Sequence, residues 1–474
     1  MPTTPDAEPR TEDLVTRLVR VFPLVLLLAL FAAMLRSATS PVDNADTLFH
    51  LRFGHEFLTD WSLRHPGSVS SLATSPWVPT QWLSEIVFAR FEDWFGLRGV
   101  AWLTGLQVTG FVLVLYVACR RWAAPAGAVV PTMLATIAAG GGLSGRPQVL
   151  SYLLVVVVTD AWLRTRHDGR IRWWLIPLTW LWTMLHGMWP VGIVIGLVAV
   201  AGGLLEHRNG RRATRELAVP LLSAAAAGLT PLGLAAYGGV VAVGARAQYI
   251  PEWATPDFTT LNPLALLTMF AVLLAVRVRT GGMTWSQTLL LLLAGSWAVY
   301  SGRTVAVSAA LAAPLLAQTL QTVLPPRPVV TRRERQVVLG AFLAGLVGLA
   351  AILPAVDVTP KQSPGLDAAL DALPAGTTLL NEWSQGGYLM WRHPDLDVGM
   401  HGYVDTYSLS EIDRLVALLA TAPGWEETLE STGASWALLS SEGPLAGRLE
   451  DELGWSAVEE YDGRVLLRSP SADG

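Results

Sequence analysis

Long apolar runs recur along most of the chain, and short polar segments rich in arginine separate them. A run of about 20 predominantly apolar residues can cross the hydrocarbon core of a bilayer as an α-helix. The pattern therefore predicts about eleven membrane-spanning helices. The expected spans cover about residues 16–37, 99–118, 124–143, 148–163, 172–187, 188–205, 216–235, 262–278, 285–301, 304–323 and 336–354.

Arginine gathers at every second boundary of this pattern. The clusters are Arg17 and Arg20; Arg120 and Arg121; Arg164, Arg166, Arg170 and Arg172; Arg208, Arg211, Arg212 and Arg215; Arg277 and Arg279; and Arg327, Arg332, Arg333 and Arg335. Basic residues in short loops favour the cytoplasmic side, so the N-terminus is predicted to be cytoplasmic. The first loop, about residues 38–98, and everything after residue 355 then lie on the extracytoplasmic side of the plasma membrane.

Composition supports a membrane protein. The chain has 474 residues, of which 52% are hydrophobic and 15% are charged, whereas soluble domains average about 25% charged residues. The formal net charge of -5 gives no sign of a nucleic-acid partner. A single cysteine, Cys119, excludes a disulfide framework or a cysteine-based zinc site within one chain.

The character of the sequence changes after residue 355. Residues 360–364 read as a short linker, and about 110 residues of more polar sequence follow, an ordinary size for a soluble domain. Helical patterns at 366–373, 410–419 and 445–453 alternate with strand-like segments at 377–380, 436–439 and 465–467. We therefore expect a transmembrane domain over 1–355 and a small α/β domain over 356–474.

The first loop opens with a polar stretch directly after the first span. If this stretch is helical, Asp43, Asp46 and His50 share one face, because they are spaced i, i+3 and i+7. Such a face can accept a proton or hold a metal ion through oxygen and nitrogen ligands. The alternative is an ordinary amphipathic helix lying at the bilayer surface.

Three further polar residues are expected near the membrane on the same side as this loop. They are Arg146, His186 and Arg303. Taken singly, each fits an interfacial arginine or a histidine at a helix end. Together they favour a shared polar cavity, in which arginines suit the oxygens of a phosphate.

A second group of acidic residues lies at Glu252, Trp253 and Asp257. This loop could stack a sugar ring on the tryptophan and hydrogen-bond its hydroxyl groups. The alternative is an exposed loop that Trp253 anchors at the interface.

In the terminal domain, Gly386 and Gly387 follow a predicted strand and permit a tight turn or a close backbone approach. His393, His401 and Asp405 match no metal-ligand spacing, so surface positions are expected for them. The chain contains no GxSxG, HExxH or CxxC motif, which leaves hydrolase, zinc-protease and redox functions without support.

Taken in order, the short motifs resemble the GT-C superfamily of integral-membrane glycosyltransferases. More narrowly, they are similar to a group of bacterial multispan proteins with a first-loop Asp-Thr-aromatic-aromatic-His motif. The matching segments are Asp46 to His50, Trp82 to Glu85, Arg146 to Gln148, His186-Gly187, Glu252-Trp253 and Gly386 to Tyr388. Leu48 stands where the group usually has an aromatic residue, and His401-Gly402-Tyr403 replaces a frequent Asp-Gly-Arg element.

The resemblance implies a GT-C-like transmembrane fold and a sugar donor linked to polyprenyl phosphate. It places the catalytic base at Asp46 or Asp43, with His50 in support, and it fits donor-phosphate contacts at Arg146, His186 and Arg303. Glu252, Trp253 and Asp257 are the candidate sugar contacts, and the acceptor would be a glycan, a lipid or a protein. Some superfamily members need a divalent metal such as Mg²⁺ or Mn²⁺ and others do not, so the metal stays open.

The alternative function is a non-catalytic membrane protein. It would be a transporter of lipid-linked glycans, or a scaffold whose terminal domain binds a partner. Transporters of this kind often contain inverted repeats, and the chain shows no such internal symmetry.

Overall fold

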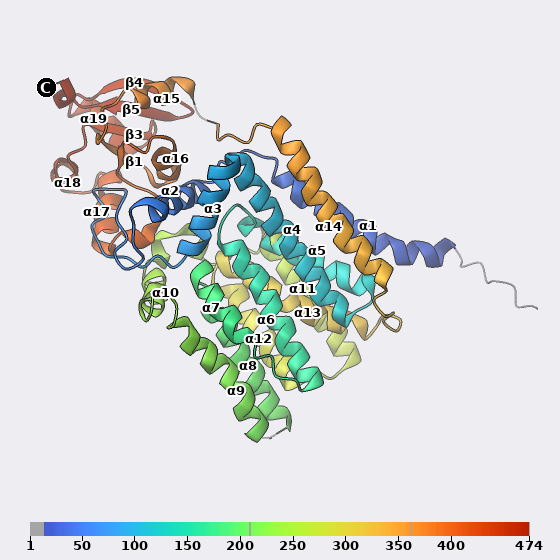
Figure 1. Cartoon of the computed structure of the whole chain (residues 1–474). Helices are drawn as coiled ribbons and strands as arrows, with labels where there is room; N and C mark the ends of the chain where they lie inside the picture. The colour runs from blue at the N-terminus through green and yellow to red at the C-terminus, as the bar shows by residue number, and fades with distance from the viewer. Residues whose placement is uncertain (1–13, 208–209, 362, 474) are drawn as a thin grey trace, which may run out of the picture.

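The computed structural model describes residues 14–207, 210–361 and 363–473. A bundle of long helices forms most of the molecule, and a small domain that contains a sheet packs against one end of it (Figure 1). We call this end of the bundle the domain end. Two helices of the first loop, α2 (Ala45–Thr59) and α3 (Trp82–Phe95), lie between the bundle and the small domain (Figure 1).

Each expected span overlaps one helix of the bundle. These helices are α1 (Leu14–Ser37), α4 (Leu97–Trp122), α5 (Pro125–Ala139), α6 (Gln148–Asp168), α7 (Leu175–Leu185), α8 (Pro190–His207), α9 (Gly210–Ala227), α11 (Leu261–Thr280), α12 (Trp285–Tyr300), α13 (Gly302–Gln321) and α14 (Arg332–Ile352). Within the described residues, five helices are long and apolar enough to cross a membrane, namely α4, α6, α11, α13 and α14 with its short extension to Ala355. Several of the others are apolar but shorter, so the number of spans stays a prediction.

Helix α13 is the centre of the bundle. It contacts α4, α5, α6, α11 and α12, and nearly all of its residues from Val305 to Ala317 are buried. Six of them are alanine, whose small side chain lets neighbouring helices approach closely. Ser308 on this helix donates a hydrogen bond to the carbonyl of Ala294 on α12 at 2.7 Å.

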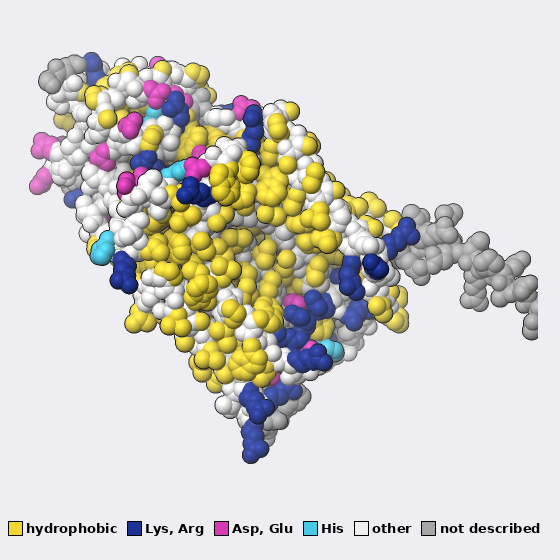
Figure 2. Space-filling view, in the orientation of Figure 1, with side chains coloured by type: hydrophobic (Ala, Val, Ile, Leu, Met, Phe, Trp, Pro, Cys, Tyr) yellow, Lys and Arg dark blue, Asp and Glu magenta, His cyan; other side chains and the backbone are white. Residues whose placement is uncertain are grey.

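Basic side chains gather at the end of the bundle away from the sheet (Figure 2). Arg120 of α4 pairs with Glu334 of α14 at 2.7 Å, and Arg121 pairs with Asp160 of α6 at 3.1 Å. The arginines in Figure 2 therefore gather at one end, in agreement with their spacing along the chain. Arg208 and the side chains of Arg17 and Arg20 lie outside the described residues, and which end faces the cytoplasm stays a prediction.

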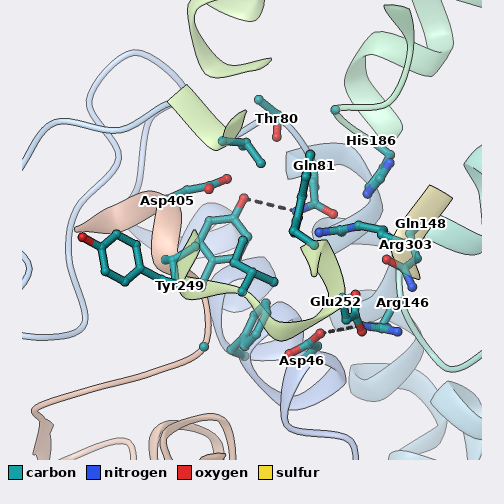
Figure 3. Close-up of a pocket in the computed structure, with 18 of the residues that line it drawn as sticks. Asp46, Thr80, Gln81, Arg146, Gln148, His186, Tyr249, Glu252, Arg303 and Asp405 are labelled. Atoms are coloured by element: carbon teal, nitrogen blue, oxygen red, sulfur yellow. Dashed lines mark hydrogen bonds and ion pairs between the residues drawn. The ribbon is translucent and has the colours of Figure 1, made fainter. Parts of the chain in front are cut away.

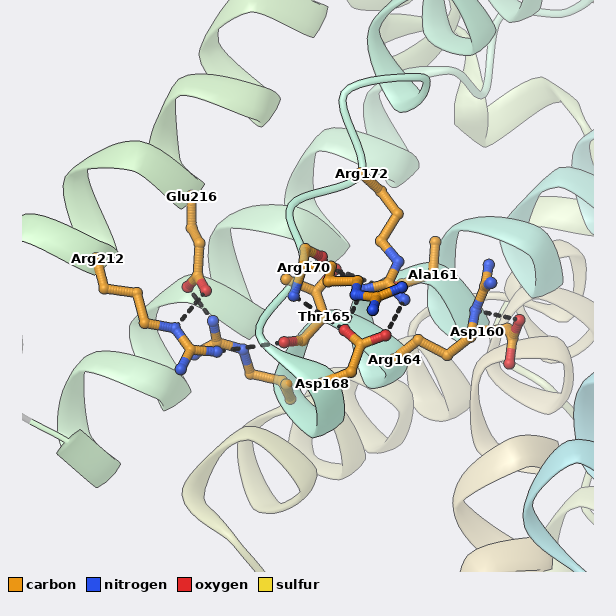
Figure 4. A network of polar contacts seen from close by, with 10 residues as sticks. Asp160, Ala161, Arg164, Thr165, Asp168, Arg170, Arg172, Arg212 and Glu216 are labelled. Atoms are coloured by element: carbon orange, nitrogen blue, oxygen red, sulfur yellow. Dashed lines mark hydrogen bonds and ion pairs between the residues drawn. The ribbon is translucent and has the colours of Figure 1, made fainter.

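Two buried carboxylates connect the helices at this arginine-rich end (Figure 4). Asp160 is contacted by Arg121 and Arg164, and Glu216 of α9 is contacted by Arg166 and Arg212. Each carboxylate joins α6 to a second helix through charge-assisted hydrogen bonds, which are stronger than neutral ones. Arg121 and Arg166 therefore help to hold these helices together.

The segment expected to be a loop at about 236–261 contains helix instead. It forms α10 (Ala235–Ala245) and the short 3-10 turns η2 (Ala247–Tyr249) and η3 (Pro251–Trp253). The glycines within α10 conceal a helical pattern in the sequence. A further turn, η1 (Gly140–Gly142), links α5 to the loop before α6.

The small domain contains a five-stranded sheet in the order β2-β1-β3-β5-β4. Its strands are β1 (Thr378–Asn381), β2 (Asp397–Val398), β3 (Trp436–Ser440), β4 (Ser456–Tyr461) and β5 (Arg464–Arg468). Its helices and turns are α15 (Pro364–Asp371), α16 (Trp383–Arg392), η5 (Val404–Thr406), α17 (Leu409–Leu419), α18 (Trp425–Thr432), α19 (Pro444–Asp451) and η6 (Pro470–Asp473), whereas the short turn η4 (Leu353–Ala355) extends α14 of the bundle. Strands β2, β1 and β3 are parallel, whereas β5 and β4 run antiparallel to their neighbours.

The paired glycines lie inside helix α16 and mark a close backbone approach rather than a turn. A Cβ atom on Gly387 would collide with the backbone carbonyl of Ala45, at the start of α2, and one on Gly386 would collide with the carbonyl of Met400. Only glycine lets α16 pack this closely. The small domain therefore lies directly on the first loop.

The expectation of surface positions is wrong for His393 and His401, because both are buried in the small domain. His393 contacts the carboxylates of Asp367 and Asp371 at 3.2 and 2.9 Å. His401 packs against aromatic rings of α2 and of the segment after η5. Both are fixed by tertiary packing that the spacing along the chain does not show.

Candidate active site

A cavity of about 530 Å³ lies between the domain end of the bundle and the small domain (Figure 3). Its walls come from α2, the loop before α6, the end of α7, η3, the start of α13 and residues 402–405. It brings together seven of the predicted site residues from five separate parts of the chain. They are Asp46, His50, Arg146, His186, Glu252, Trp253 and Arg303.

Arg146 joins two of the predicted carboxylates. Its Nη1 atom donates to Asp46 Oδ2 and to Glu252 Oε1, each at 2.8 Å. The guanidinium is buried, while the two carboxylates are about one-third exposed. Burial works against the charge of Arg146, but Glu252 and Asp46 together raise its pKa above the ordinary value. The cavity therefore holds a fixed positive charge between two acidic groups.

The loop that carries Arg146 is held on both sides. Ser144 Oγ accepts a hydrogen bond from Arg146 Nε at 2.9 Å. Thr47 Oγ1 on α2 donates to the carbonyl of Gly145 at 2.9 Å. The side chain of Asn44 caps the first turn of α2 by accepting from the backbone N–H groups of Asp46 and Thr47. Asp46 and Arg146 are thus placed by backbone contacts as well as by their own ion pair.

His50 is paired with a residue that the spacing along the chain did not single out. Its Nδ1 atom lies 3.0 Å from Oε1 of Glu85 on α3, and both side chains are buried. Burial lowers the pKa of His50 and raises the pKa of Glu85, because each loses the water that stabilises its charged form. Burial therefore favours the uncharged form of each side chain, and His50 lies on the wall of the cavity.

His186 follows the last residue of α7 and points into the cavity (Figure 3). Its Nδ1 atom accepts a hydrogen bond from the backbone N–H of Met188 at 3.3 Å and lies 2.9 Å from Ser151 Oγ. That hydroxyl also accepts from the indole N–H of Trp182 at 2.7 Å. With Nδ1 engaged as an acceptor, Nε2 carries the ring proton and is the donor available to a ligand.

Arg303 is the second cation of the cavity and enters at the start of α13. Its guanidinium carbon lies 5.9 Å from the centre of the Trp253 ring, a cation–π geometry. The Trp253 loop is fixed to α13, because the N–H of Gly302 donates to the carbonyl of Ala254 at 2.9 Å. The two arginines therefore lie on one wall, around the Glu252-Trp253 loop.

Two predicted site residues lie outside this cavity. Asp43 is exposed, just before the N-cap of α2. Asp257 accepts hydrogen bonds from the backbone N–H and the hydroxyl of Thr259, at 2.9 and 2.7 Å, and borders a smaller cavity of about 250 Å³ behind the Glu252 loop. The structure thus separates Asp43 from Asp46, which the sequence left as equal candidates.

Sequence reasoning missed two acidic residues at this site: Glu85, which lies behind His50, and Asp405, which lines the cavity. Glu85 was present only as the last letter of a short motif, and the buried face of α3 that it shares with Phe88 was the available signal. Asp405, expected at the surface, lines the cavity together with Tyr403. No periodicity marks Asp405, because it lies in the single turn η5.

The described residues do not fit a divalent metal held by the protein. No three His, Cys, Asp or Glu side chains among them converge as such a site requires. The two closest candidates, Asp46 and Glu252, have Arg146 Nη1 between them at 2.8 Å from each. The guanidinium of Arg146 thus supplies the positive charge between these two carboxylates.

Comparison with known proteins gives a match in structure only. No protein-family model matches the chain, and no curated protein matches its sequence. The solved structure of the oligosaccharyltransferase AglB from Archaeoglobus fulgidus, with an inhibitory peptide and a dolichol-phosphate, is similar with a TM-score of 0.58 and 11% identity. That likeness covers 90% of this chain and 70% of AglB.

ArnT from Cupriavidus metallidurans, solved with undecaprenyl phosphate, is similar with a TM-score of 0.55 and 13% identity. Here the likeness covers 94% of this chain and 98% of ArnT. AglB and ArnT are both GT-C membrane glycosyltransferases. The likeness over 90% and 94% of this chain therefore shows that it shares the membrane-protein fold of AglB and ArnT.

Proposed function

We propose that the chain is a membrane glycosyltransferase that moves a sugar from a polyprenyl-phosphate donor to an extracytoplasmic acceptor. The observation that carries the proposal is the cavity itself, in which Asp46 lies within one site with two arginines, Arg146 and Arg303, at the domain end of a GT-C bundle. The lipid phosphates bound to AglB and ArnT support a donor of this class.

In the proposed reaction, the Asp46 carboxylate takes the proton of an acceptor hydroxyl. The hydroxyl oxygen attacks the anomeric carbon of the donor sugar while the bond from that carbon to the phosphate oxygen breaks. The departing lipid phosphate keeps the electron pair of this bond. Arg303, Arg146 and the Nε2–H of His186 stabilise its charge, as fixed donors do for a developing anion. Glu252 and Trp253 would contact the sugar.

Asp46, rather than Asp43, is the proposed base because it alone of the two faces the cavity. Its second oxygen, Oδ1, is directed toward Gly402, where an added Cβ would lie 3.6 Å away. The ion pair with Arg146 uses Oδ2, so one oxygen stays free to accept a proton.

The test compares Asp46→Asn with Asp43→Asn, a matched control three residues away in the same loop. The assay is sugar transfer from a radiolabelled undecaprenyl-phosphate sugar to envelope acceptors, with the purified chain in nanodiscs. Loss of a general base costs about 10²–10⁴-fold, so Asp46→Asn should lose activity by this factor while still binding donor. Asp43→Asn should stay within about twofold of the wild type. An unchanged transfer rate in Asp46→Asn would refute the proposed mechanism. Movement of intact donor across the membrane without sugar transfer would indicate a transporter.

A further inference from the structure

The wall of the cavity that faces away from the bundle belongs to the small domain. Trp383, Ser384 and residues 402–405 contribute to it. Gly402 comes so close to the first loop that an added Cβ would lie 3.6 Å from Asp46 Oδ1 and 3.5 Å from the ring of Phe49. The small domain therefore forms the part of the wall that lies next to Asp46.

Asp405 is the acidic group of this wall, across the cavity from Asp46 and Arg146 (Figure 3). The charged groups that act on it are Arg246 after α10 and Arg303 of α13. Asp405 in turn raises the pKa of Glu85 on α3 and of Tyr403. Burial raises the pKa of Asp405 to about 6, even though Arg246 and Arg303 both act to lower it. Asp405 is therefore a carboxylate that carries its charge at neutral pH and loses it in mild acid.

The two walls differ in charge. The bundle wall holds the guanidinium groups of Arg146 and Arg303, which suit a lipid phosphate. The domain wall holds Asp405 and also the half-buried side chain of Trp383, whose ring packs edge-on against Tyr407 at 5.4 Å between ring centres. A carboxylate accepts hydrogen bonds from hydroxyl groups, and an aromatic face packs on the C–H groups of a sugar ring. The same carboxylate repels an anion.

We infer that Asp405 selects the acceptor: the domain wall binds an uncharged, hydroxyl-bearing sugar and rejects an anionic one once the bundle wall holds the donor phosphate. This inference rests on the proposed function, since it treats the two walls as acceptor and donor sides of one cavity. Asp405 would act by contact with the acceptor, whereas Asp46 would take the proton.

The test measures binding and does not depend on transfer. The full chain is placed in nanodiscs loaded with undecaprenyl phosphate, so that the arginines are occupied. Binding of methyl β-glucoside and of methyl β-glucuronide, which differ in one carboxylate, is then followed by saturation-transfer difference NMR. At pH 7.5 the wild type should bind the glucuronide about tenfold more weakly or worse, because like charges repel in a partly desolvated site.

Asp405→Asn should remove this preference, and Asp405→Glu should keep it. The matched control is Asp451→Asn, an exposed aspartate on α19 of the same domain, which should behave as the wild type. At pH 5 the preference of the wild type should shrink, because Asp405 is then protonated while the glucuronide, with an ordinary carboxyl pKa of about 3–4, is still charged.

Equal binding of the two glycosides by the wild type, or an unchanged preference in a folded Asp405→Asn variant, would overturn the inference. Thermal unfolding of each variant checks that it is folded. If the preference is found but no sugar transfer is detected, the inference stands and the proposed function fails. If sugar transfer is found without the preference, the proposed function stands and the inference about Asp405 fails.

Discussion

Replacing Glu85 by glutamine tests whether the buried His50–Glu85 pair beside the cavity is neutral. Oε1 of Glu85 lies 3.0 Å from His50 Nδ1, whereas Oε2 is buried without a hydrogen-bond partner among the described residues. An ionised carboxylate would leave half of its charge unsatisfied in this position, which is costly. A protonated carboxyl group has no such charge, in agreement with the raised pKa of Glu85.

The magnitude follows from the contacts. Glutamine keeps the size of the side chain and one hydrogen bond to His50. Its second polar atom takes the position of Oε2, which has no hydrogen-bond partner in the wild type either. If the pair is neutral, Glu85→Gln should cost about 1 kcal/mol or less, the size of one imperfect neutral hydrogen bond. If the pair is ionic, removing one charge from a buried pair should cost about 3–5 kcal/mol. Glu85→Ala, which leaves Nδ1 unpaired beside a void, should cost about 2–4 kcal/mol in either case.

The way in which the cost of Glu85→Gln changes with pH is an independent test of the protonation state of Glu85. A carboxyl group with a raised pKa keeps its proton in the folded state at pH values where the unfolded chain has already released it. The free energy of unfolding of the wild type therefore falls as the pH rises above 4.5, the ordinary pKa of glutamate. Glutamine has no proton to release. The lowered pKa of His50 favours stability at higher pH, but it is present in both proteins and cancels in the comparison. The cost of Glu85→Gln should therefore shrink between pH 5 and pH 8.

Reversible unfolding in mixed dodecylmaltoside–SDS micelles, at pH 5 and pH 8, measures these differences. A cost of about 3 kcal/mol or more that grows with pH would show that Glu85 is ionised and would refute the neutral pair. Glu85→Ala is the positive control, because it should lower the free energy of unfolding whether the pair is neutral or ionic.

Two further predictions concern packing. Gly387→Ala should destabilise the chain by about 1–3 kcal/mol, because the new methyl group would push α16 away from the carbonyl of Ala45. Gly447→Ala in α19, where nothing lies within 4 Å, should instead stabilise by about 0.5–1 kcal/mol, and equal effects in thermal unfolding would contradict the close approach. Arg120→Ala should cost about 3–5 kcal/mol in the same assay, since it leaves Glu334 without its two contacts at 2.7 and 3.0 Å. A cost below about 1 kcal/mol would show that this pair contributes little to holding α4 against α14.

The positions of the long helices could be predicted from the sequence, because the length of an apolar run is a property of the chain alone. The arginine clusters likewise indicated which helix ends share a side. That reasoning placed Asp46, Arg146 and Glu252 on one side of the membrane, although 100 residues separate the first two, and the structure brings all three into contact. The glycines of α10 concealed a helix, because glycine has a low helix propensity.

Other features depended on the tertiary structure. Asp43 and Asp46 are nearly equivalent in sequence, and only the start of α2 at Ala45, after the Asn44 cap, leaves one outside the cavity. The paired glycines indicated a close backbone approach, but only the structure shows that Gly387 approaches the carbonyl of Ala45.

Glu85 and Asp405 show the limit most clearly. Each is a single acidic residue whose role depends on which distant segments cover it. Packing of α2 against α3 buries Glu85 against His50, and this burial raises the pKa of Glu85. Asp405 becomes part of a cavity wall because the small domain packs on the first loop. The sequence by itself determined the membrane fold and the acidic and basic residues of one face. Only the tertiary structure decided which of them face the cavity, because burial and ionisation depend on neighbours that are far apart along the chain.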